Sequence, residues 1–213
     1  MSEGKVRYLN KGYIRGSIKY MVTHRNSLEF LVITDAARKK AELWIKAFDA
    51  ALLDGIRAGD LIELFCHVEL RKVNKKAEDH DKNNYDQQII ADFVRPAKRA
   101  LYYDAPEYML YDDYSGGHPR DENTFQAAGM LMNVFSPNDF MSIATIKVAD
   151  GNKNNLLNVS CYRRQNEFIK SMEKNAFVVV TGSMINGSVK PDGTNSEMFY
   201  CVDIARPILE DNG

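Results

Sequence analysis

The sequence lacks any long apolar run. No part of its 213 residues approaches the ~20 consecutive apolar residues that a membrane-spanning helix needs. No apolar segment follows the first basic residue, Lys5, so the N-terminus does not resemble a signal peptide. With 45% hydrophobic and 27% charged residues, the composition is that of a folded globular protein. We therefore expect a cytoplasmic protein without a membrane segment.

Cysteine is scarce in the chain. The three cysteines, Cys66, Cys161 and Cys201, are odd in number, far apart and embedded in apolar runs. This pattern is typical of buried thiols in a reducing compartment, and it disfavours a disulfide framework or a zinc site.

Arrangements of residues suited to catalysis are also absent. The four histidines, His24, His67, His80 and His118, occur at no metal-ligand spacing from cysteines or carboxylates. There is no glycine-rich loop for phosphates and no nucleophile motif. The charged cluster at 78–81 is typical of a solvated loop tip rather than a metal site. The sequence therefore predicts a protein that is not an enzyme and carries no metal or cofactor.

The chain has no excess of positive charge, which is the usual electrostatic footprint of a nucleic-acid binder. Its 28 basic and 29 acidic residues give a net charge of −1. Residues 1–100 carry 19 Lys or Arg against 14 Asp or Glu, whereas residues 101–124 carry one against six. Residues 125–213 carry eight against nine. A basic surface is therefore expected only in the first part of the chain.

What the sequence does contain is an internal repeat. Its clearest element is Asp92–Pro96, which is matched by Asp203–Pro207 after a similar apolar run. Two further pairs keep the same order: 14–18 with 128–131, and 30–35 with 145–150. The three offsets of 111, 113 and 115 residues indicate two copies of one module with small insertions. The arginines of the two Arg-Pro pairs, Arg95 and Arg206, are expected to satisfy an acid or a carbonyl, with proline ending the strand.

The segment between the copies is acidic, rich in tyrosine and interrupted by Gly116–Pro119. A loop of this length is uncommon inside a compact domain, which supports a boundary here. We predict a first module at 1–98, a linker at 99–123 and a second module at 124–213. Part of the linker is expected to pack on a module. The alternative, a row of tyrosines for bases, is disfavoured by its acidity.

Alternating apolar residues predict five strands in each copy. The predicted strands span 12–20, 28–34, 41–48, 61–70 and 85–94 in the first copy, and 125–134, 141–149, 156–162, 177–185 and 198–205 in the second. Short helices are expected near 49–57, where Gly59 ends the first, and near 165–174. This β-β-β-α-β-β order predicts an all-β fold with short helices: two tandem five-stranded Greek-key barrels of the oligonucleotide-binding (OB) type.

Three segments, Gly12–Gly16, Trp44–Phe48 and Gly59–Leu64, resemble the bacterial and phage single-stranded DNA-binding protein family with tandem OB-folds. The resemblance covers most of both modules and rests on pattern rather than on a signature motif. It implies an OB-fold protein that binds single-stranded DNA. Two departures restrict what it implies. The ending Glu210–Gly213 lacks the apolar tip of the family's acidic tail, and two barrels are fused here, so tail-mediated recruitment and tetramer formation are not carried over.

The third predicted strand carries the best candidate binding face. Leu43, Ile45 and Ala47 share one side of this strand, whereas Trp44, Lys46 and Phe48 share the other. Base stacking on an aromatic ring contributes roughly 1–3 kcal/mol and tolerates any base, while cations hold phosphates. The basic run Arg38, Lys39 and Lys40 precedes the strand. Alternatively, Trp44 caps the barrel or lies in a subunit interface, and Phe48 seats the helix.

Further candidate contacts are weaker. Those of the first module are Tyr13, Arg15 and Lys19 on the outward side of its first strand, and Arg71 and Lys72 at a basic loop between its fourth and fifth strands. Those of the second module are Lys147, Tyr162, Arg163 and Arg164. The other loops of the second module are rich in Gly and Asn rather than basic, so dimerisation is as good an interpretation as binding.

Aromatic and basic residues interleaved on a predicted OB barrel favour a sequence-tolerant single-stranded DNA-binding protein acting in DNA replication or recombination. The near-neutral charge and the tyrosine-rich linker favour the alternative of a protein-interaction or scaffold module. RNA binding shares the same physics and stays open. Expected partners are single-stranded DNA, or RNA, with a homo-oligomer or a replication protein as further candidates.

Overall fold

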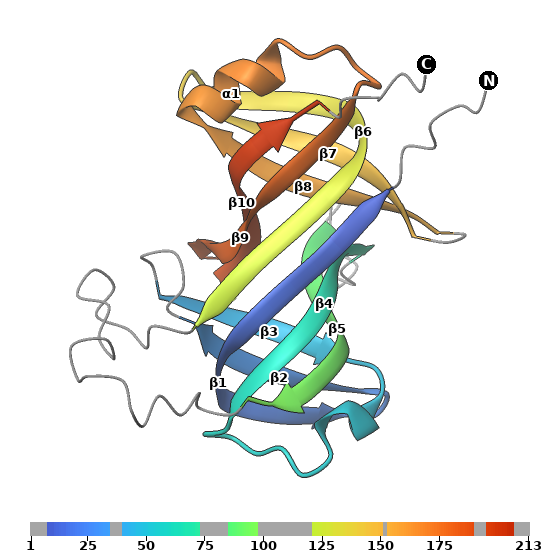
Figure 1. Ribbon diagram of the computed structural model, residues 1–213, viewed down its shortest axis with the longest axis vertical. Coiled ribbons are helices and arrows are strands. Elements are labelled where there is room, and N and C mark those ends of the chain that lie inside the picture. The colour runs from blue at the N-terminus through green and yellow to red at the C-terminus, as the bar shows by residue number, and fades with distance from the viewer. Residues whose placement is uncertain are drawn as a thin grey trace, which may run out of the picture. The chain divides into compact units, whose positions relative to one another are not determined.

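A computed structural model describes residues 8–34, 40–72, 85–97, 121–150, 153–189 and 195–206. These residues are mostly in β-strands and fall into two compact units (Figure 1). The N-terminal unit comprises Gly12–Thr124 and Met184–Glu197. The C-terminal unit comprises Met1–Lys11, Phe125–Ser183 and Met198–Gly213. In the described part of the chain, no helix is long and apolar enough to cross a membrane.

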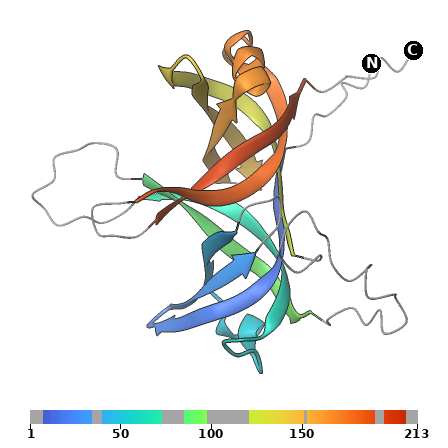
Figure 2. The same cartoon turned by 90° about the vertical axis from the view of Figure 1, so that its left-hand side faces the viewer.

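The first five strands, which we call the first ring, form a closed barrel, in blue to green in Figures 1 and 2. They are β1 (Leu9–His24), β2 (Ser27–Thr34), β3 (Ala41–Ala47), β4 (Leu61–Lys72) and β5 (Tyr85–Pro96). The pairing order is β1-β2-β3-β5-β4, and β4 returns to β1. Only β3 and β5 run parallel among these pairs; the others are antiparallel. Each of these strands therefore has a neighbouring strand on both sides, so the barrel has no edge strand.

Alternation along each strand fills the interior of this barrel. On β3, the side chains of Leu43, Ile45 and Ala47 are buried, whereas Trp44 faces outward, which confirms the predicted faces of this strand. The same core contains Ile14 and Ile18 of β1, Phe30 and Val32 of β2, Ile62 and Leu64 of β4, and Ile89 of β5. Each large buried side chain stabilises the fold by roughly 1.5–3 kcal/mol.

The helix predicted at 49–57 is much shorter than expected. It is one turn of 3-10 helix, η2 (Ala50–Leu53), capped by Asp49, whose carboxylate accepts the Ala51 N–H at 3.0 Å. Gly55 has a φ of +75°, a left-handed conformation that ends a helix and that glycine adopts at little cost. The predicted stop at Gly59 was wrong because Gly55 ends the helix first.

The five strands of the second half of the sequence, which we call the second ring, pair in the same cyclic order. They are β6 (Glu122–Asn138), β7 (Met141–Asp150), β8 (Lys153–Tyr162), β9 (Phe177–Val189) and β10 (Asn195–Ala205). The order is β6-β7-β8-β10-β9, β9 also pairs with β6, and β8 and β10 run parallel. One helix, α1 (Arg163–Lys170), lies between β8 and β9. The predicted span of 165–174 overlaps α1 but begins and ends too late.

Both rings carry a glycine where two strands cross closely. A Cβ added to Gly16 would lie 2.3 Å from the Ile33 carbonyl oxygen, and one added to Gly129 would lie 2.2 Å from that of Lys147. Gly16 and Gly129 differ by 113 residues, as the repeat predicts, but Ile33 and Lys147 differ by 114. The predicted match of 30–35 with 145–150 is therefore wrong by one residue. With the predicted offset of 115 residues, the buried Phe30 would correspond to Thr145, which faces outward.

The first strands of the two rings also share a bulge. The pairing shifts between Ile18 and Tyr20 in β1, and between Leu131 and Asn133 in β6. At both places a residue with positive φ donates its N–H to the strand: Gly59 to Ile18 at 2.8 Å, and Asn175 to Leu131 at 2.7 Å. The two rings therefore share an irregular feature of the backbone as well as a pairing order.

Two asparagine side chains act as backbone substitutes in the N-terminal unit. The Asn186 amide accepts the Glu42 N–H at 2.8 Å and donates to the Glu42 carbonyl at 2.6 Å. The buried Asn123 makes the same pair of bonds with the backbone of Met184, at 3.0 and 2.7 Å. The segment that carries Met184 and Asn186 thereby satisfies polar groups of β3 and β6 that would otherwise need other partners.

Candidate functional site

The outer side of β1, β2 and β3 carries a row of large side chains that we call the aromatic row: Tyr20, Leu31 and Trp44. Their Cα atoms are in register, Tyr20 opposite Leu31 and Leu31 opposite Trp44. Tyr20 is 55% exposed and Trp44 is 36% exposed, whereas Leu31 between them is only 5% exposed. The aromatic rings of Tyr20 and Trp44 are therefore exposed to solvent on either side of the buried Leu31, which we call the apolar floor.

Tyr20 is a candidate site residue that the sequence analysis did not predict. Strict alternation from the buried Ile14 and Ile18 would point Tyr20 into the barrel. The bulge between Ile18 and Tyr20 inserts one residue and turns Tyr20 outward. The alternation of apolar residues does not reveal this bulge. The only sequence feature that points to Tyr20 is a large aromatic residue directly after Lys19.

Two lysines lie beside the aromatic row, and each is paired with a carboxylate. Lys46 contacts Glu29 at 3.1 Å, and Lys19 contacts Glu42 at 3.0 Å. The hydrogen bond to Glu42 raises the pKa of Lys19. The ammonium of Lys46 also lies 5.6 Å from the centre of the exposed Phe48 ring. The structure therefore brings together the predicted residues Trp44, Lys46, Phe48 and Lys19.

Other predicted contacts of the first module are placed differently. Tyr13 and Arg15 face outward from the half of β1 that pairs with β4, so they lie away from the aromatic row. Tyr13 packs on the exposed Phe65 at 5.2 Å, and Arg15 contacts Glu63 at 3.4 Å. Tyr13, Arg15 and Lys19 all lie on the outward side of β1, as predicted, but only Lys19 lies beside the aromatic row, because Tyr13 and Arg15 belong to the half of β1 that pairs with β4.

The structure describes the side chain of only one of the remaining predicted cations of the first module. Lys40 is exposed directly before β3. Arg38 and Lys39 lie outside the described residues, as do the 78–81 cluster and most of the predicted linker. Arg71 and Lys72 form the end of β4, where only their backbone is described.

Arg95 has the structural role that the sequence predicts. Its guanidinium donates two hydrogen bonds to one oxygen of Glu63, at 2.8 and 2.6 Å, across the β4–β5 pair. Phe93 lies in register with Phe65, and the two exposed rings are 6.4 Å apart. We call the outward residues of this region, Tyr13, Arg15, Glu63, Phe65, Phe93 and Arg95, the β1–β4–β5 face.

In the C-terminal unit, the positions that correspond to the aromatic row are polar. Asn133, Thr145 and Asn158 are in register there, and the Thr145 hydroxyl donates to the Asn158 amide oxygen at 3.0 Å. The predicted Lys147 faces outward on β7, between Met130 and Leu156. This unit therefore lacks the Tyr–Leu–Trp arrangement at the equivalent place.

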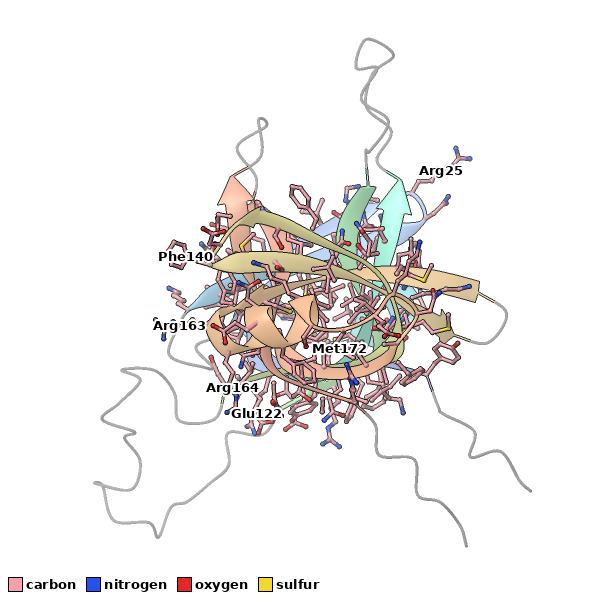
Figure 3. All side chains as sticks on the ribbon, turned by 90° about the horizontal axis from the view of Figure 1, so that it is seen from above. Arg25, Glu122, Phe140, Arg163, Arg164 and Met172 are labelled. Atoms are coloured by element: carbon pink, nitrogen blue, oxygen red, sulfur yellow. The ribbon has the colours of Figure 1, made fainter. Side chains whose placement is uncertain are left out.

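Aromatic side chains of the C-terminal unit gather instead near the start of α1. The predicted Tyr162 packs on Tyr200 at 5.5 Å, and burial raises the pKa of Tyr162. The exposed Arg163 and Arg164 follow directly. Phe140, which sequence reasoning missed, is 80% exposed in the β6–β7 turn, where the Asn138 side chain accepts its N–H. Figure 3 shows the side chains of Phe140 and Arg163 projecting away from the ribbon.

The three cysteines are packed in the interior, and the two described histidines, His24 and His67, lie in ion pairs. All three cysteines are free and buried, as predicted, and burial raises the pKa of Cys66. His67 lies 2.8 Å from Asp92 and 3.2 Å from Glu69, and its hydrogen bond to Asp92 is the main cause of its raised pKa. Within the described residues, no group of three or more His, Cys, Asp or Glu could hold a metal ion.

Comparison with known proteins identifies a shared fold. No protein-family profile matches the chain, and no curated protein matches it in sequence. Among solved structures, the wild-type single-stranded DNA binding protein from Thermus aquaticus superposes with a TM-score of 0.66 at 15% identity, over 96% of this chain and 95% of that one. A deletion mutant of the same protein gives a TM-score of 0.64 at 15% identity, over 96% and 97%. The two proteins share one fold. At this identity, the likeness establishes the fold and not the activity.

Proposed function

We propose that the chain is a single-stranded DNA-binding protein of DNA replication or recombination, built from tandem OB-fold barrels. The proposed modules span 1–98 and 124–213, joined by the linker at 99–123. Support comes from the common pairing order of the two rings and from their shared glycine and bulge positions. The fold in common with the Thermus aquaticus protein agrees with this proposal.

The observation that carries the proposal is the aromatic row with Lys19 and Lys46 beside it. Two exposed rings, Tyr20 and Trp44, offer stacking surfaces on an apolar floor. Stacking contributes roughly 1–3 kcal/mol per base and does not distinguish sequences, because every base has a π-face. The lysines, with the exposed Lys40, supply phosphate contacts. Arg38, Lys39, Arg71 and Lys72 remain proposed contributors, and nothing in this binding mode requires a reacting group.

A second candidate function is supported by the charge. The net charge of −1 and the carboxylate partners of both lysines are less favourable for a polyanion than for a protein partner. An RNA strand would use the same stacking surfaces. Competition between oligo-dT and oligo-dU separates DNA from RNA preference, and association with a protein that ignores salt would favour the interaction module.

Trp44 is the sole tryptophan of the chain, which makes the test direct. Titration with oligo-dT is expected to quench its fluorescence, and the affinity is expected to fall as salt rises. Trp44→Ala, followed by anisotropy of labelled oligo-dT, should weaken binding. The matched control is Phe93→Ala, which removes an exposed ring from the β1–β4–β5 face of the same unit and should leave binding unchanged. No quenching at low salt, or equal effects of the two variants, would contradict the proposal.

A further inference from the structure

Both lysines beside the aromatic row are occupied by carboxylates from the same surface. Glu29 lies in register with Lys46 across β2 and β3, and their charged atoms are 3.1 Å apart. Glu42 lies two residues before Trp44 on β3 and holds Lys19 at 3.0 Å. In each pair, both side chains are about a quarter to two-fifths exposed, with values between 23% and 39%. A ligand can therefore reach the ammonium groups from solvent.

Carboxylate and phosphate oxygens seek the same partner, because both are anions that accept charge-assisted hydrogen bonds from an ammonium group. An ion pair at the surface contributes little to folding and exchanges readily. A nucleic-acid backbone that contacts Lys46 or Lys19 must therefore displace Glu29 or Glu42, or share the lysine with it. The released carboxylate then remains close to the phosphate and repels it.

We infer that Glu29 and Glu42 are intramolecular competitors of the phosphate backbone, which lower the affinity of the aromatic row for single strands and reduce its salt dependence. The inference rests on the proposed function, because it concerns the same surface. The two glutamates touch the lysines rather than the bases, so they set the strength of binding without forming the stacking site. A binder regulated in this way releases its strand readily.

A local mechanism of this kind differs from a general effect of charge. Glu63 provides the matched comparison, because it pairs with Arg15 and Arg95 on the β1–β4–β5 face. Removing the charge of Glu29, Glu42 or Glu63 changes the net charge by the same amount. Local competition predicts that only the first two changes strengthen binding, whereas a general effect predicts three similar gains.

The experiment measures oligo-dT affinity between 0.1 and 1 M NaCl for wild type, Glu29→Gln, Glu42→Gln and Glu63→Gln. Each phosphate contact contributes about 0.7 to the salt slope for single strands, which corresponds to about a fivefold gain at 0.1 M relative to 1 M. We expect gains up to this size for Glu29→Gln and Glu42→Gln and none for Glu63→Gln. Since His24 also contacts Glu29 at 3.3 Å, all titrations are run at one fixed pH.

A double-mutant cycle identifies the lysine through which the gain acts. In a Lys46→Met background, Glu29→Gln should no longer strengthen binding, while Glu42→Gln should still do so. Equal gains in both backgrounds, or unchanged affinities for both glutamine variants, overturn the inference. If Trp44→Ala weakens binding in that case, the proposed function stands and only the competition fails. If wild type does not bind oligo-dT, both are overturned.

Discussion

Tyr20 and Trp44 show how a single inserted residue changes a surface. The bulge after Ile18 brings the Tyr20 ring to the same side as Trp44, with Leu31 between them. Leu31 is buried although it lies on the outward side of β2, so the two aromatic rings stand on an apolar background.

We expect Tyr20→Ala to weaken oligo-dT binding about 5- to 150-fold, the range that corresponds to losing one stacked base at roughly 1–3 kcal/mol. Tyr20→Phe keeps the ring and should bind like wild type. Anisotropy titrations of the two variants check this expectation. Equal loss in both variants would assign the effect to the hydroxyl, and no loss in either would remove Tyr20 from the site.

His67 supplies a prediction about stability and pH. Its pKa is raised above the ordinary value of 6.5, mainly by the hydrogen bond to Asp92, so the folded protein holds this proton more tightly than the unfolded chain does. The resulting stabilisation is fully present below pH 6.5 and is lost as the pH rises through the raised pKa. The urea midpoint of wild type should therefore fall relative to that of His67→Gln over this interval. A constant difference between the two proteins would contradict the assignment.

At the scale of elements, the extent to which sequence predicts structure depends on regularity. The strand expected at 41–48 is found at Ala41–Ala47 with the expected faces, because buried and exposed residues alternate without interruption. Trp44 and Lys46 could be predicted for the same reason. Tyr20 could not, since the bulge depends on backbone hydrogen bonds to Asp60 and Gly59, far along the chain. The ion pairs of Lys19 and Arg15 depend on which strands become neighbours.

Replacing Gly16 or Gly129 by alanine tests whether the close approach of the two strands at these positions is needed for stability. Because the new Cβ would meet backbone oxygen, which cannot rotate away, Gly16→Ala and Gly129→Ala should each lower the free energy of unfolding by about 1–3 kcal/mol or more. Urea unfolding measures the loss. Ser17→Ala, at the neighbouring outward position of β1, is the control and should change stability little. Wild-type stability of both alanine variants would show that the strands separate without cost.

At the scale of the whole molecule, the number of cations that contact phosphates determines how strongly salt affects binding. The described cations nearest the aromatic row are Lys19, Lys40 and Lys46. Three phosphate contacts correspond to a slope of log affinity against log salt of about −2. A wild-type slope near this value would show that these three lysines account for the phosphate contacts. A much steeper value would indicate that cations outside the described residues, such as Arg38 and Lys39, carry the binding.

The unequal surfaces of the two units predict unequal contributions to binding. The C-terminal unit has Asn133, Thr145 and Asn158 where the N-terminal unit has its aromatic row. Phe140→Ala in the full chain should therefore weaken oligo-dT binding less than Trp44→Ala does. Anisotropy titrations of both variants at one salt concentration provide the comparison. A larger loss for Phe140→Ala would reverse the order of the units.

The asparagine bridges have a consequence for any attempt to divide the chain. The N-terminal unit contains Met184–Glu197, and through Asn186 this segment completes the edge of β3 at Glu42. A gene cut at the repeat boundary would therefore encode a first half with an unfinished strand edge. Neither predicted module can therefore be deleted or transplanted as a cassette without losing the two hydrogen bonds between Asn186 and the backbone of Glu42.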